Sequence, residues 1–263
     1  MNSARVLEVL SGVGDDAVSI QQFRKIVIGL AMSGRLLPSR QSEVQTVELI
    51  EAIENQKRIL VEQGAIRQQS LLEPLSQDDL PNGFGHPVDF VRLGGIARIE
   101  KGLTGIMKAK VGPYPLVVTA EDRAKCDHFD FDGAAAIVPL VSSAGHGKAS
   151  LQRLHYQEGK FALGSILAAI FPYAPELLSA RFLFEYLSAF KDELLVSRMI
   201  GTANVSLSVA KIADVPVPLV SPPVQRQVDG LMKLCDQLES VRKKREAART
   251  KLLDALLAEA MAF

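Results

Sequence analysis

The chain has 263 residues, 48% of them hydrophobic and 23% charged, and its 30 lysines and arginines balance 30 aspartates and glutamates. This composition excludes a disordered chain, and the length allows one large domain or two smaller ones. The neutral balance also excludes nucleic-acid binding through overall charge, so phosphate-binding residues would have to be concentrated locally. The two cysteines, Cys126 and Cys235, lie too far apart in the sequence for a zinc knuckle or a disulfide framework.

Signals for export or membrane insertion are missing from the sequence. The run from Phe161 to Ile170 comes closest to a membrane span, but it is short and contains Gly164 and Ser165. The segment Met1 to Val13 carries one arginine and no apolar core followed by a cleavage site. We therefore expect a cytoplasmic protein.

Two amphipathic helices are predicted near the N-terminus. From Ser19 to Ser33, apolar residues recur at steps of three and four, and Gly34 follows at a position typical of a helix end. A second helix is predicted from about Val44 to Gln63, with Gly64 as its C-terminal stop. The next residues, Gln68 to Gly85, are rich in Gln, Ser, Asp, Pro and Gly, which indicates a linker.

Short strand-like runs separated by Gly and Asp turns follow in the middle of the chain. The runs are Val88–Leu93, Ala97–Ile99, Leu116–Thr119, Ala135–Val141 and Val215–Leu219. Because proline cannot donate to a sheet ladder, Pro139 predicts that the fourth run is an edge strand or two shorter pieces. One helix is predicted between them, from Ser179 to about Leu195. Strands and helices do not alternate as in a doubly wound sheet, so we expect an α+β fold with one mixed domain.

A heptad pattern follows Ser221-Pro222-Pro223. Its positions are Leu231, Leu234, Leu238, Val241, Arg245, Ala248, Leu252 and Ala255, and Arg245 is the one misfit. A helix from Pro223 to Phe263 would be roughly 60 Å long at about 1.5 Å per residue. The pattern favours a coiled coil that pairs through Leu231, Leu234, Leu238, Val241 and Leu252. The alternative is a helix folded lengthwise onto its own domain.

Two motifs resemble enzyme motifs but lack residues that those motifs require. Gly145-His146-Gly147-Lys148 resembles a phosphate loop, but Ser142 replaces the required glycine and Ala149 replaces the required Ser or Thr. Ser221-Pro222-Pro223-Val224 lacks the aromatic residue that follows the prolines in amino-methyltransferases. We therefore predict no catalytic residues and no enzyme activity in this chain.

The triplet Cys126, Asp127 and His128 contains residue types that bind metals. Three consecutive side chains seldom converge on one ion, however. We expect a polar turn that leads to Phe129, and no metal site.

Basic and small polar residues cluster in three loops of the middle block. Lys and Arg can neutralise phosphates, and Asn, Ser, Thr and Arg can also contact base edges. Residues of these types are also common at solvated loop positions, which is the alternative interpretation. The DNA-binding candidates are Lys101, Thr104, Lys108, Lys110, His146, Lys148, Arg153, Arg198, Thr202, Asn204 and Ser206.

Several further motifs occur in a characteristic order along the chain. The first is the helical stretch Phe23 to Pro38, FRKIVIGLAMSGRLLP. The others, in chain order, are Leu80-Pro81-Asn82-Gly83-Phe84, Val91-Arg92-Leu93-Gly94, Gly201, Ser206-Leu207-Ser208, Val215-Pro216-Val217-Pro218 and Gln225-Arg226-Gln227. In this order the motifs resemble the specificity (S) subunits of type I restriction–modification enzymes. This chain departs from the family in having no Trp, since Gly85-His86-Pro87 follows the turn, and in having one recognition domain instead of two. It therefore resembles a half-subunit.

The resemblance implies a division of the chain into four parts: a helical segment at 1–42, a helix and linker at 43–85, a DNA target-recognition domain at 86–220, and a coiled-coil helix at 221–263. The last part is implied to serve dimerisation and methyltransferase docking. The implied function is non-catalytic recognition of a bipartite site in double-stranded DNA, as part of phage defence. S-adenosylmethionine is implied in a partner methyltransferase and not in this chain.

The implied partners are a second copy of the chain, with which it would form a homodimer, the methyltransferase subunit and a restriction (translocase/nuclease) subunit. No membrane contact is implied. Two alternatives remain at this point. One is a recognition subunit of another phage-defence or modification assembly. The other is a coiled-coil scaffold that does not bind DNA.

Overall fold

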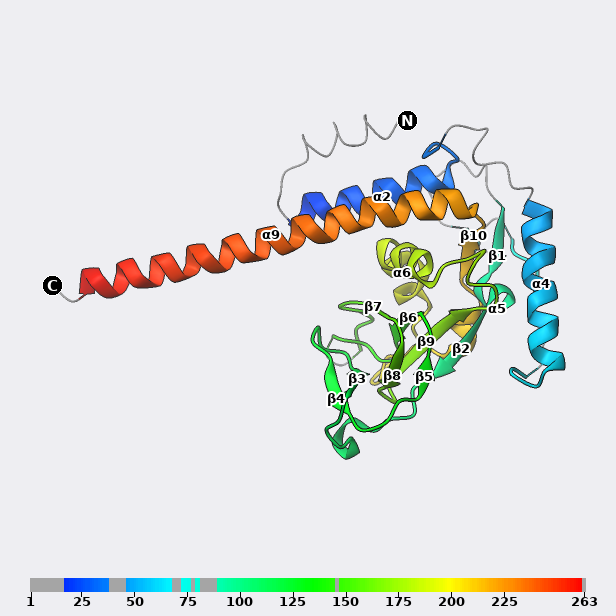
Figure 1. The fold of residues 1–263 in the computed structure, drawn as a ribbon, viewed down its shortest axis with the longest axis horizontal. Helices are drawn as coiled ribbons and strands as arrows, with labels where there is room; N and C mark the ends of the chain where they lie inside the picture. The colour runs from blue at the N-terminus through cyan, green and yellow to red at the C-terminus, as the bar shows by residue number, and fades with distance from the viewer. Residues whose placement is uncertain are drawn as a thin grey trace.

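A computed structural model describes residues 17–37, 46–67, 72–76, 79–80, 89–144 and 147–261 (Figure 1). The helical elements are α2 (Ala17–Met32), α4 (Thr46–Glu62), α5 (Leu93–Ile96), η2 (Ile106–Lys108), α6 (Ala180–Ala189), α7 (Lys191–Leu194), η3 (Val196–Arg198), α8 (Val209–Ala213) and α9 (Pro222–Met261). The strands are β1 (Phe90–Arg92), β2 (Ala97–Lys101), β3 (Tyr114–Val117), β4 (Ala124–Cys126), β5 (Phe131–Asp132), β6 (Ala135–Pro139), β7 (His155–Gln157), β8 (Lys160–Leu163), β9 (Leu167–Pro172) and β10 (Pro216–Pro218).

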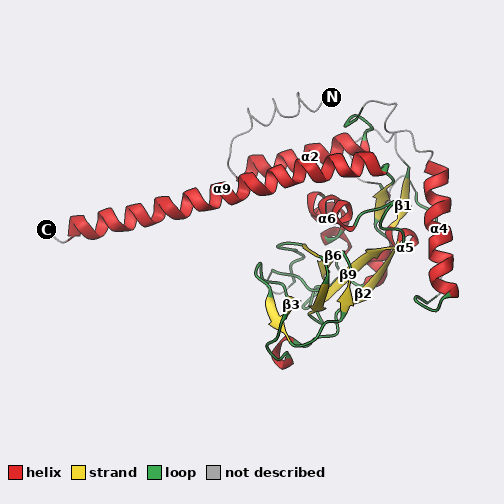
Figure 2. Cartoon of the chain, viewed as in Figure 1, coloured by secondary structure: helices red, strands yellow, loops and turns green. Residues whose placement is uncertain are grey.

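The described strands form three sheets. The central sheet has the order β2-β9-β6-β7, a second has the order β4-β3-β8-β5, and β1 pairs with β10. Figure 2 shows most of the strands below α2, α6 and α9, with α4 beside them and the long α9 extending beyond the rest of the molecule. The expected α+β fold with a long C-terminal helix is confirmed.

The central sheet is buried on both faces, which explains why its strands lack an alternating pattern. In β9, Ala168 and Ile170 face the core shared with the helices, whereas Leu167, Ala169 and Phe171 face the core shared with the second sheet. A strand covered on both sides reads as a continuous apolar run. The run Phe161 to Ile170 is therefore the end of β8, a bridge residue at Gly164, a turn at Ser165 and Ile166, and most of β9.

The expectation of an edge strand at Pro139 is wrong. β6 lies between β9 and β7, so it is an interior strand. Pro139 is its last residue, and the pairing with β7 has already ended at Ile137. The next residue, Leu140, donates its N–H to the carbonyl oxygen of Ile166 on the β9 side at 2.8 Å. Because neighbouring amides alternate in direction, the proline nitrogen faces the side where no ladder bond is needed.

Helix boundaries follow the predicted glycines but include one break. Gly34 and Gly64 adopt φ angles of 65° and 69° beyond α2 and α4, the left-handed conformation that ends helices. The helix predicted from Ser179 to Leu195 is divided into α6 and α7 at Phe190, whose φ and ψ are −117° and 27°. The Phe190 side chain is buried in the core, so packing overrides helical continuity there.

Helices α2 and α9 run antiparallel, and α6 lies beneath them (Figure 1). Arg24 of α2 connects the three helices, because its guanidinium contacts Glu185 of α6 at 3.4 Å and Asp236 of α9 at 2.7 Å. Arg181 completes the network, contacting Glu185 at 2.5 Å and Asp236 at 2.8 Å. This partly buried charge network therefore joins α2, α6 and α9.

Candidate nucleic-acid interface

Two of the three predicted loop clusters leave the same end of the central sheet. Lys101, at the end of β2, pairs with Ala168 near the start of β9. Pro139, at the end of β6, pairs with Leu167 at that same start. Because β9 lies between β2 and β6, the loops that follow β2 and β6 emerge side by side.

The third cluster joins the loop after β6. Ser142 donates its N–H to the carbonyl of Val205 at 3.0 Å, and Leu207 donates to Leu140 at 2.8 Å. The predicted residues Thr202, Asn204 and Ser206 are exposed on this side. His146 lies outside the described residues, so its position stays a prediction.

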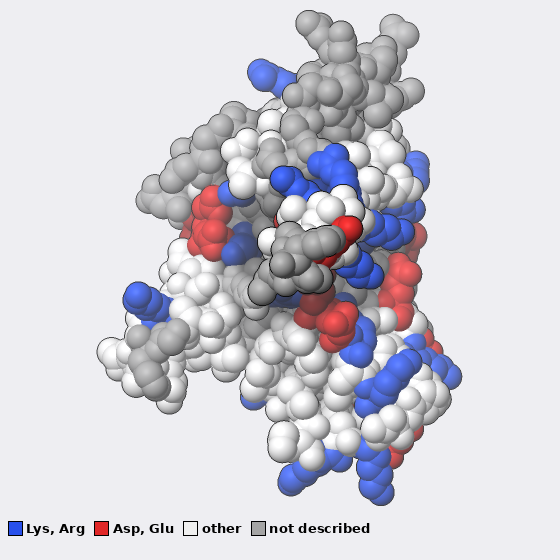
Figure 3. All heavy atoms as spheres, turned by 90° about the vertical axis from the view of Figure 1, so that its left-hand side faces the viewer, with Lys and Arg blue, Asp and Glu red and all other residues white. Residues whose placement is uncertain are grey.

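Exposed lysines extend along this end of the domain. Lys101, Lys108, Lys110 and Lys148 are all exposed. Within the described ranges, Lys101, Lys108 and Lys148 form no side-chain hydrogen bond or ion pair, so their charges are free to bind an anion. In Figure 3, Lys and Arg side chains gather at the lower end of the molecule, where Figure 1 places the loop between β2 and β3.

Thr104, a DNA-binding candidate from the sequence, is buried in the structure. It is 5% exposed, and its hydroxyl donates to Asp130 Oδ2 at 2.9 Å and lies 3.0 Å from His128 Nε2. Asp130 Oδ2 also accepts the N–H of Leu163 at 2.8 Å. Thr104 is therefore an internal anchor of its loop and not a surface contact. Asp130 was missed because no sequence pattern distinguishes it from an ordinary turn residue.

Arg153 is bound within the chain by an acidic side chain. Its guanidinium contacts Glu121 at 2.7 Å, and the same carboxylate contacts Lys243 of α9 at 2.6 Å. Hydrogen bonds from Lys243 and Arg153 lower the pKa of Glu121. Glu121, which sequence analysis did not single out, thus links the mixed domain to the long helix.

Arg198 caps the end of α7. Its Nη1 donates to the carbonyl of Leu194 at 2.9 Å and to that of Glu193 at 3.3 Å. Cations near a helix C-terminus satisfy its free carbonyls. The side chain is half-buried. Its Nη1, part of the guanidinium that we predicted to contact bases, is already hydrogen-bonded to these carbonyls.

Cys126, Asp127 and His128 do converge, contrary to the expectation from their adjacency. Their potential ligand atoms lie within 4.8 Å of one another. His128 Nδ1 lies 2.9 Å from Asp127 Oδ1 and 3.3 Å from Cys126 Sγ. The hydrogen bond with His128 lowers the pKa of Asp127. Since Nε2 also has a partner in Thr104, both imidazole nitrogens are hydrogen-bonded within the chain.

The predicted seam of α9 divides into a buried and an exposed part. Leu231 is 4% exposed and packs inside the chain, with Val228, Met232 and Cys235, against α2 and α6. The exposed fractions of Leu234, Leu238, Val241 and Leu252 are 37%, 40%, 63% and 62%. The alternative of a helix folded on its own domain therefore holds for the first turns of α9, while the later seam positions remain accessible.

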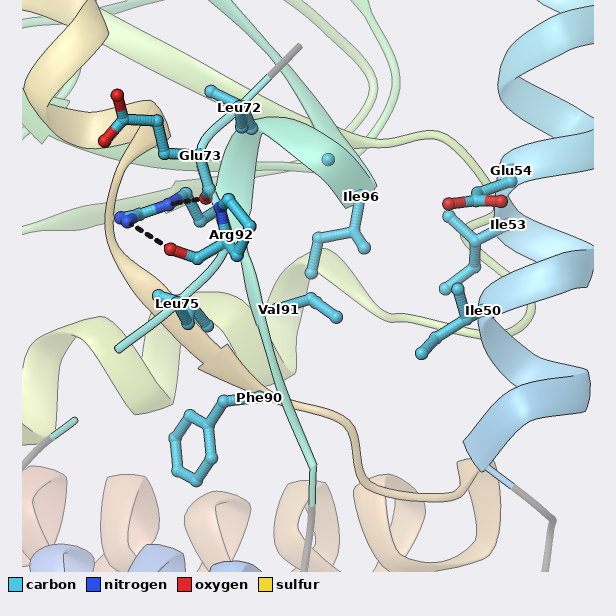
Figure 4. A pocket seen from close by; sticks show the side chains of 12 residues that line it. Ile50, Ile53, Glu54, Leu72, Glu73, Leu75, Phe90, Val91, Arg92 and Ile96 are labelled. Carbon is cyan, nitrogen blue, oxygen red and sulfur yellow. Dashed lines mark hydrogen bonds between the residues drawn. The ribbon is translucent and has the colours of Figure 1, made fainter. Parts of the chain in front are cut away.

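A cavity of about 340 Å³ lies between α4 and the β1–α5 segment (Figure 4). Ile50 and Ile53 of α4 face Val91 and Ile96 across it. Arg92 points away from α4 in Figure 4, and its guanidinium is occupied by backbone carbonyls, including that of Pro74 at 3.1 Å. The walls of the cavity are mostly apolar, and the guanidinium of Arg92 is already hydrogen-bonded. The cavity therefore marks where α4 packs on the domain and is not a reaction site.

The chain is an α+β domain on which α2 and the first part of α9 pack antiparallel to each other. Exposed polar loops lie at one end of its central sheet, and the rest of α9 is exposed. No family model matches the chain. Two curated relatives from Escherichia coli do. The chain is 25% identical to the type I restriction enzyme EcoEI specificity subunit, over 92% of this chain and 44% of the relative. It is 28% identical to the EcoAI specificity subunit, over 38% of this chain and 17% of the relative.

The predicted resemblance to type I restriction specificity subunits is confirmed by these relatives. The chain spans less than half the length of each. Solved structures similar to the chain include the type I S subunit from M. genitalium, with 14% identity and a TM-score of 0.47 over 65% of this chain and 45% of that one. Another is the HsdS subunit from Thermoanaerobacter tengcongensis, with 18% identity and a TM-score of 0.44 over 85% and 53%.

None of the helices that the structure describes combines the length and apolar character needed to cross a bilayer.

Proposed function

We propose that this chain is the non-catalytic DNA sequence-recognition subunit of a type I restriction–modification complex. The observation that carries the proposal is the sequence similarity to a specificity subunit across 92% of the chain. The exposed loops at one end of the central sheet support it, because they offer phosphate-binding lysines beside Thr202 and Asn204, which can read base edges.

The DNA-binding part of the proposal is tested by charge reversal. Lys101→Glu combined with Lys108→Glu should weaken binding to all duplex sequences and reduce the dependence on salt by about one unit of slope per lost contact. Lys233→Glu combined with Lys244→Glu is the matched control, because both lysines are exposed and lie on α9, on the side of the molecule away from the loop between β2 and β3 (Figure 1). Equal losses for both pairs would refute the loop assignment.

Base reading is a separate property with its own test. Asn204→Ala should change the discrimination between DNA sites more than the affinity for random sequence, because base contacts carry the sequence information. Arg198→Ala is expected to act in the same direction and also to loosen the end of α7, since it caps that helix. Unchanged preference in both variants would remove these two residues from the reading surface.

The chain directs partner subunits in this proposal. Adenine methylation belongs to a methyltransferase subunit that holds S-adenosylmethionine, and in a complex that also cleaves DNA a restriction subunit joins. Mapping methylated adenines in the source genome with and without the gene tests this role. Loss of one sequence-defined set of methylated sites is expected, and an unchanged pattern would contradict it.

The exposed seam of α9 is proposed to bind a second copy of the chain and the methyltransferase. Leu234, Leu238, Val241 and Leu252 remain open to such a partner. Two copies related by two-fold symmetry would present identical reading surfaces, so the target would be an interrupted palindrome. The 40 residues of α9 correspond to about 60 Å, or about 18 base pairs, which limits the half-site spacing.

The spacing can be tested directly on DNA. Inserting one base pair between the half-sites rotates one of them by about 34–36° and should sharply reduce methylation. An asymmetric or contiguous methylated motif would refute the homodimer. It would favour pairing with a different recognition domain instead.

The same exposed seam favours one other candidate, a coiled-coil scaffold that binds no DNA. The salt titration with duplex DNA separates the two candidates, because phosphate contacts make affinity fall steeply as salt rises. A scaffold would show no such binding at low salt.

A further inference from the structure

The loop between β2 and β3, residues 102–113, exposes an unusual set of side chains. We call it the tip loop. Its apolar residues Leu103, Ile106, Met107 and Val111 have exposed fractions of 75%, 43%, 97% and 85%. The loop contains two lysines and no acidic residue, and Lys101 immediately precedes it. Figure 1 shows it at the lower end of the molecule, on the side away from α9.

The first end of the tip loop is tightly held. A Cβ added to Gly102 would lie 2.2 Å from the carbonyl oxygen of Gly164, so no side chain fits there. Thr104 exchanges backbone hydrogen bonds of 3.0 Å with Leu163 and Ser165. Its hydroxyl also donates to the carboxylate of Asp130.

The second end is held in a similar way. A Cβ on Gly112 would lie 2.3 Å from the Cα of Asp127, and the Asp127 N–H donates to the carbonyl of Lys110 at 2.9 Å. The segment between the two ends, Gly105 to Ala109, includes the single turn η2. Both ends of the loop are therefore anchored to the sheets, which orients the tip in advance of binding.

Met107 is the most exposed apolar residue of this anchored tip. Its neighbour Ile106 packs back toward Gly164, with its Cδ1 3.7 Å from a Cβ placed on that glycine. Met107 is 97% exposed, whereas apolar side chains of this size are normally at least partly covered. Methionine is unbranched and polarisable, so it fits a narrow apolar gap between flat surfaces.

We propose that Met107 inserts between neighbouring base pairs of the bound DNA, with Lys101, Lys108 and Lys110 on the flanking phosphates. This inference rests on the proposed DNA-binding function. Proteins that wedge DNA insert an apolar side chain into a base step, unstack it and bind the backbone on either side. The tip loop combines an exposed apolar side chain, two lysines with no acidic residue within the loop, and two ends anchored to the sheets, which are features that such insertion requires.

The test compares two duplexes that differ by one central mismatch. A mismatched step is already weakened, so a wedge should enter it more easily. We expect the full-length wild-type chain to bind the mismatched duplex about tenfold more tightly than the paired one. Met107→Gln should lose most of that preference while keeping the same salt dependence, and Met107→Leu should retain it. Val47→Gln, an exposed apolar position on α4, is the matched control.

Three outcomes would overturn the inference in distinguishable ways. If the wild type binds DNA and Met107→Gln keeps the wild-type preference, the wedge is wrong and the proposed function stands. If the wild type binds neither duplex at low salt, the proposed function fails and the wedge fails with it. If Met107→Gln loses binding to phosphatidylserine vesicles but not the DNA preference, the tip loop is a membrane contact. Urea unfolding midpoints equal to wild type would establish that each variant is folded.

Discussion

Replacing Glu185 by Gln should destabilise the joint between the mixed domain and its long helix. The Glu185 side chain is 2% exposed and lies between two guanidiniums, Arg181 at 2.5 Å and Arg24 at 3.4 Å. Burial raises the pKa of Glu185, and the two arginines oppose that rise. Glutamine keeps the shape of the side chain but removes the negative charge that faces Arg24 and Arg181.

The size of the effect follows from what remains in the network. Removing one partner of a buried ion pair costs about 3–5 kcal/mol, because the other charge stays desolvated. Arg24 and Arg181 both keep Asp236, at 2.7 Å and 2.8 Å, so the loss should lie at the lower limit, about 3 kcal/mol. For a chain of this size that corresponds to a fall in Tm of about 6–12 °C.

Urea denaturation of the full chain measures this change in unfolding free energy. Glu193→Gln is the matched control, because Glu193 pairs with Lys25 at 3.5 Å and both side chains are about half exposed. Exposed pairs contribute about 0–1 kcal/mol, so the control should be nearly neutral. If Glu185→Gln proved no more destabilising than Glu193→Gln, the network would not be what holds α9 on the domain.

Three further predictions concern the seam, the tip loop and pH. Leu238→Asp should abolish self-association in sedimentation without changing the unfolding midpoint, whereas Ser240→Asp, also exposed on α9, should not; equal behaviour would argue against the seam. Gly102→Ala should lower the unfolding free energy by about 2 kcal/mol or more, because its Cβ would meet backbone, while Gly105→Ala should be neutral. Burial lowers the pKa of His155 to about 4, so the unfolding free energy should decrease by roughly 2 kcal/mol as pH falls from 6.5 to 4. His155→Gln should remove that slope, and a wild-type curve without it would contradict the assignment.

Periodicity predicted the elements whose burial is one-sided. The α2 helix and the long α9 were correctly anticipated, because an apolar stripe at steps of three and four is visible in any helix with one buried face. The glycines after α2 and α4 were also identified correctly, since their positive φ angles are a local property. The α+β class followed from the same local patterns.

The strands β8 and β9 were not predicted, although β6, which is also buried on both faces, was predicted within the run Ala135–Val141. β9 and the end of β8 form one apolar run, and nothing in the run marks which residue faces which core. The position of Pro139 in an interior strand depends on where β7 ends, which is a property of pairing and not of the strand itself.

The sequence by itself determined the helical scaffold, the fold class and the resemblance to specificity subunits, because these follow from short-range periodicity and the order of motifs. Only the tertiary structure decided which polar residues reach the surface. Thr104 is enclosed by Asp130 and His128, Arg153 is bound to Glu121, and Met107 protrudes, although all three occur in similar loop sequences. A side chain's availability depends on neighbours that are distant along the chain, and these are set only when the sheets and helices pack together.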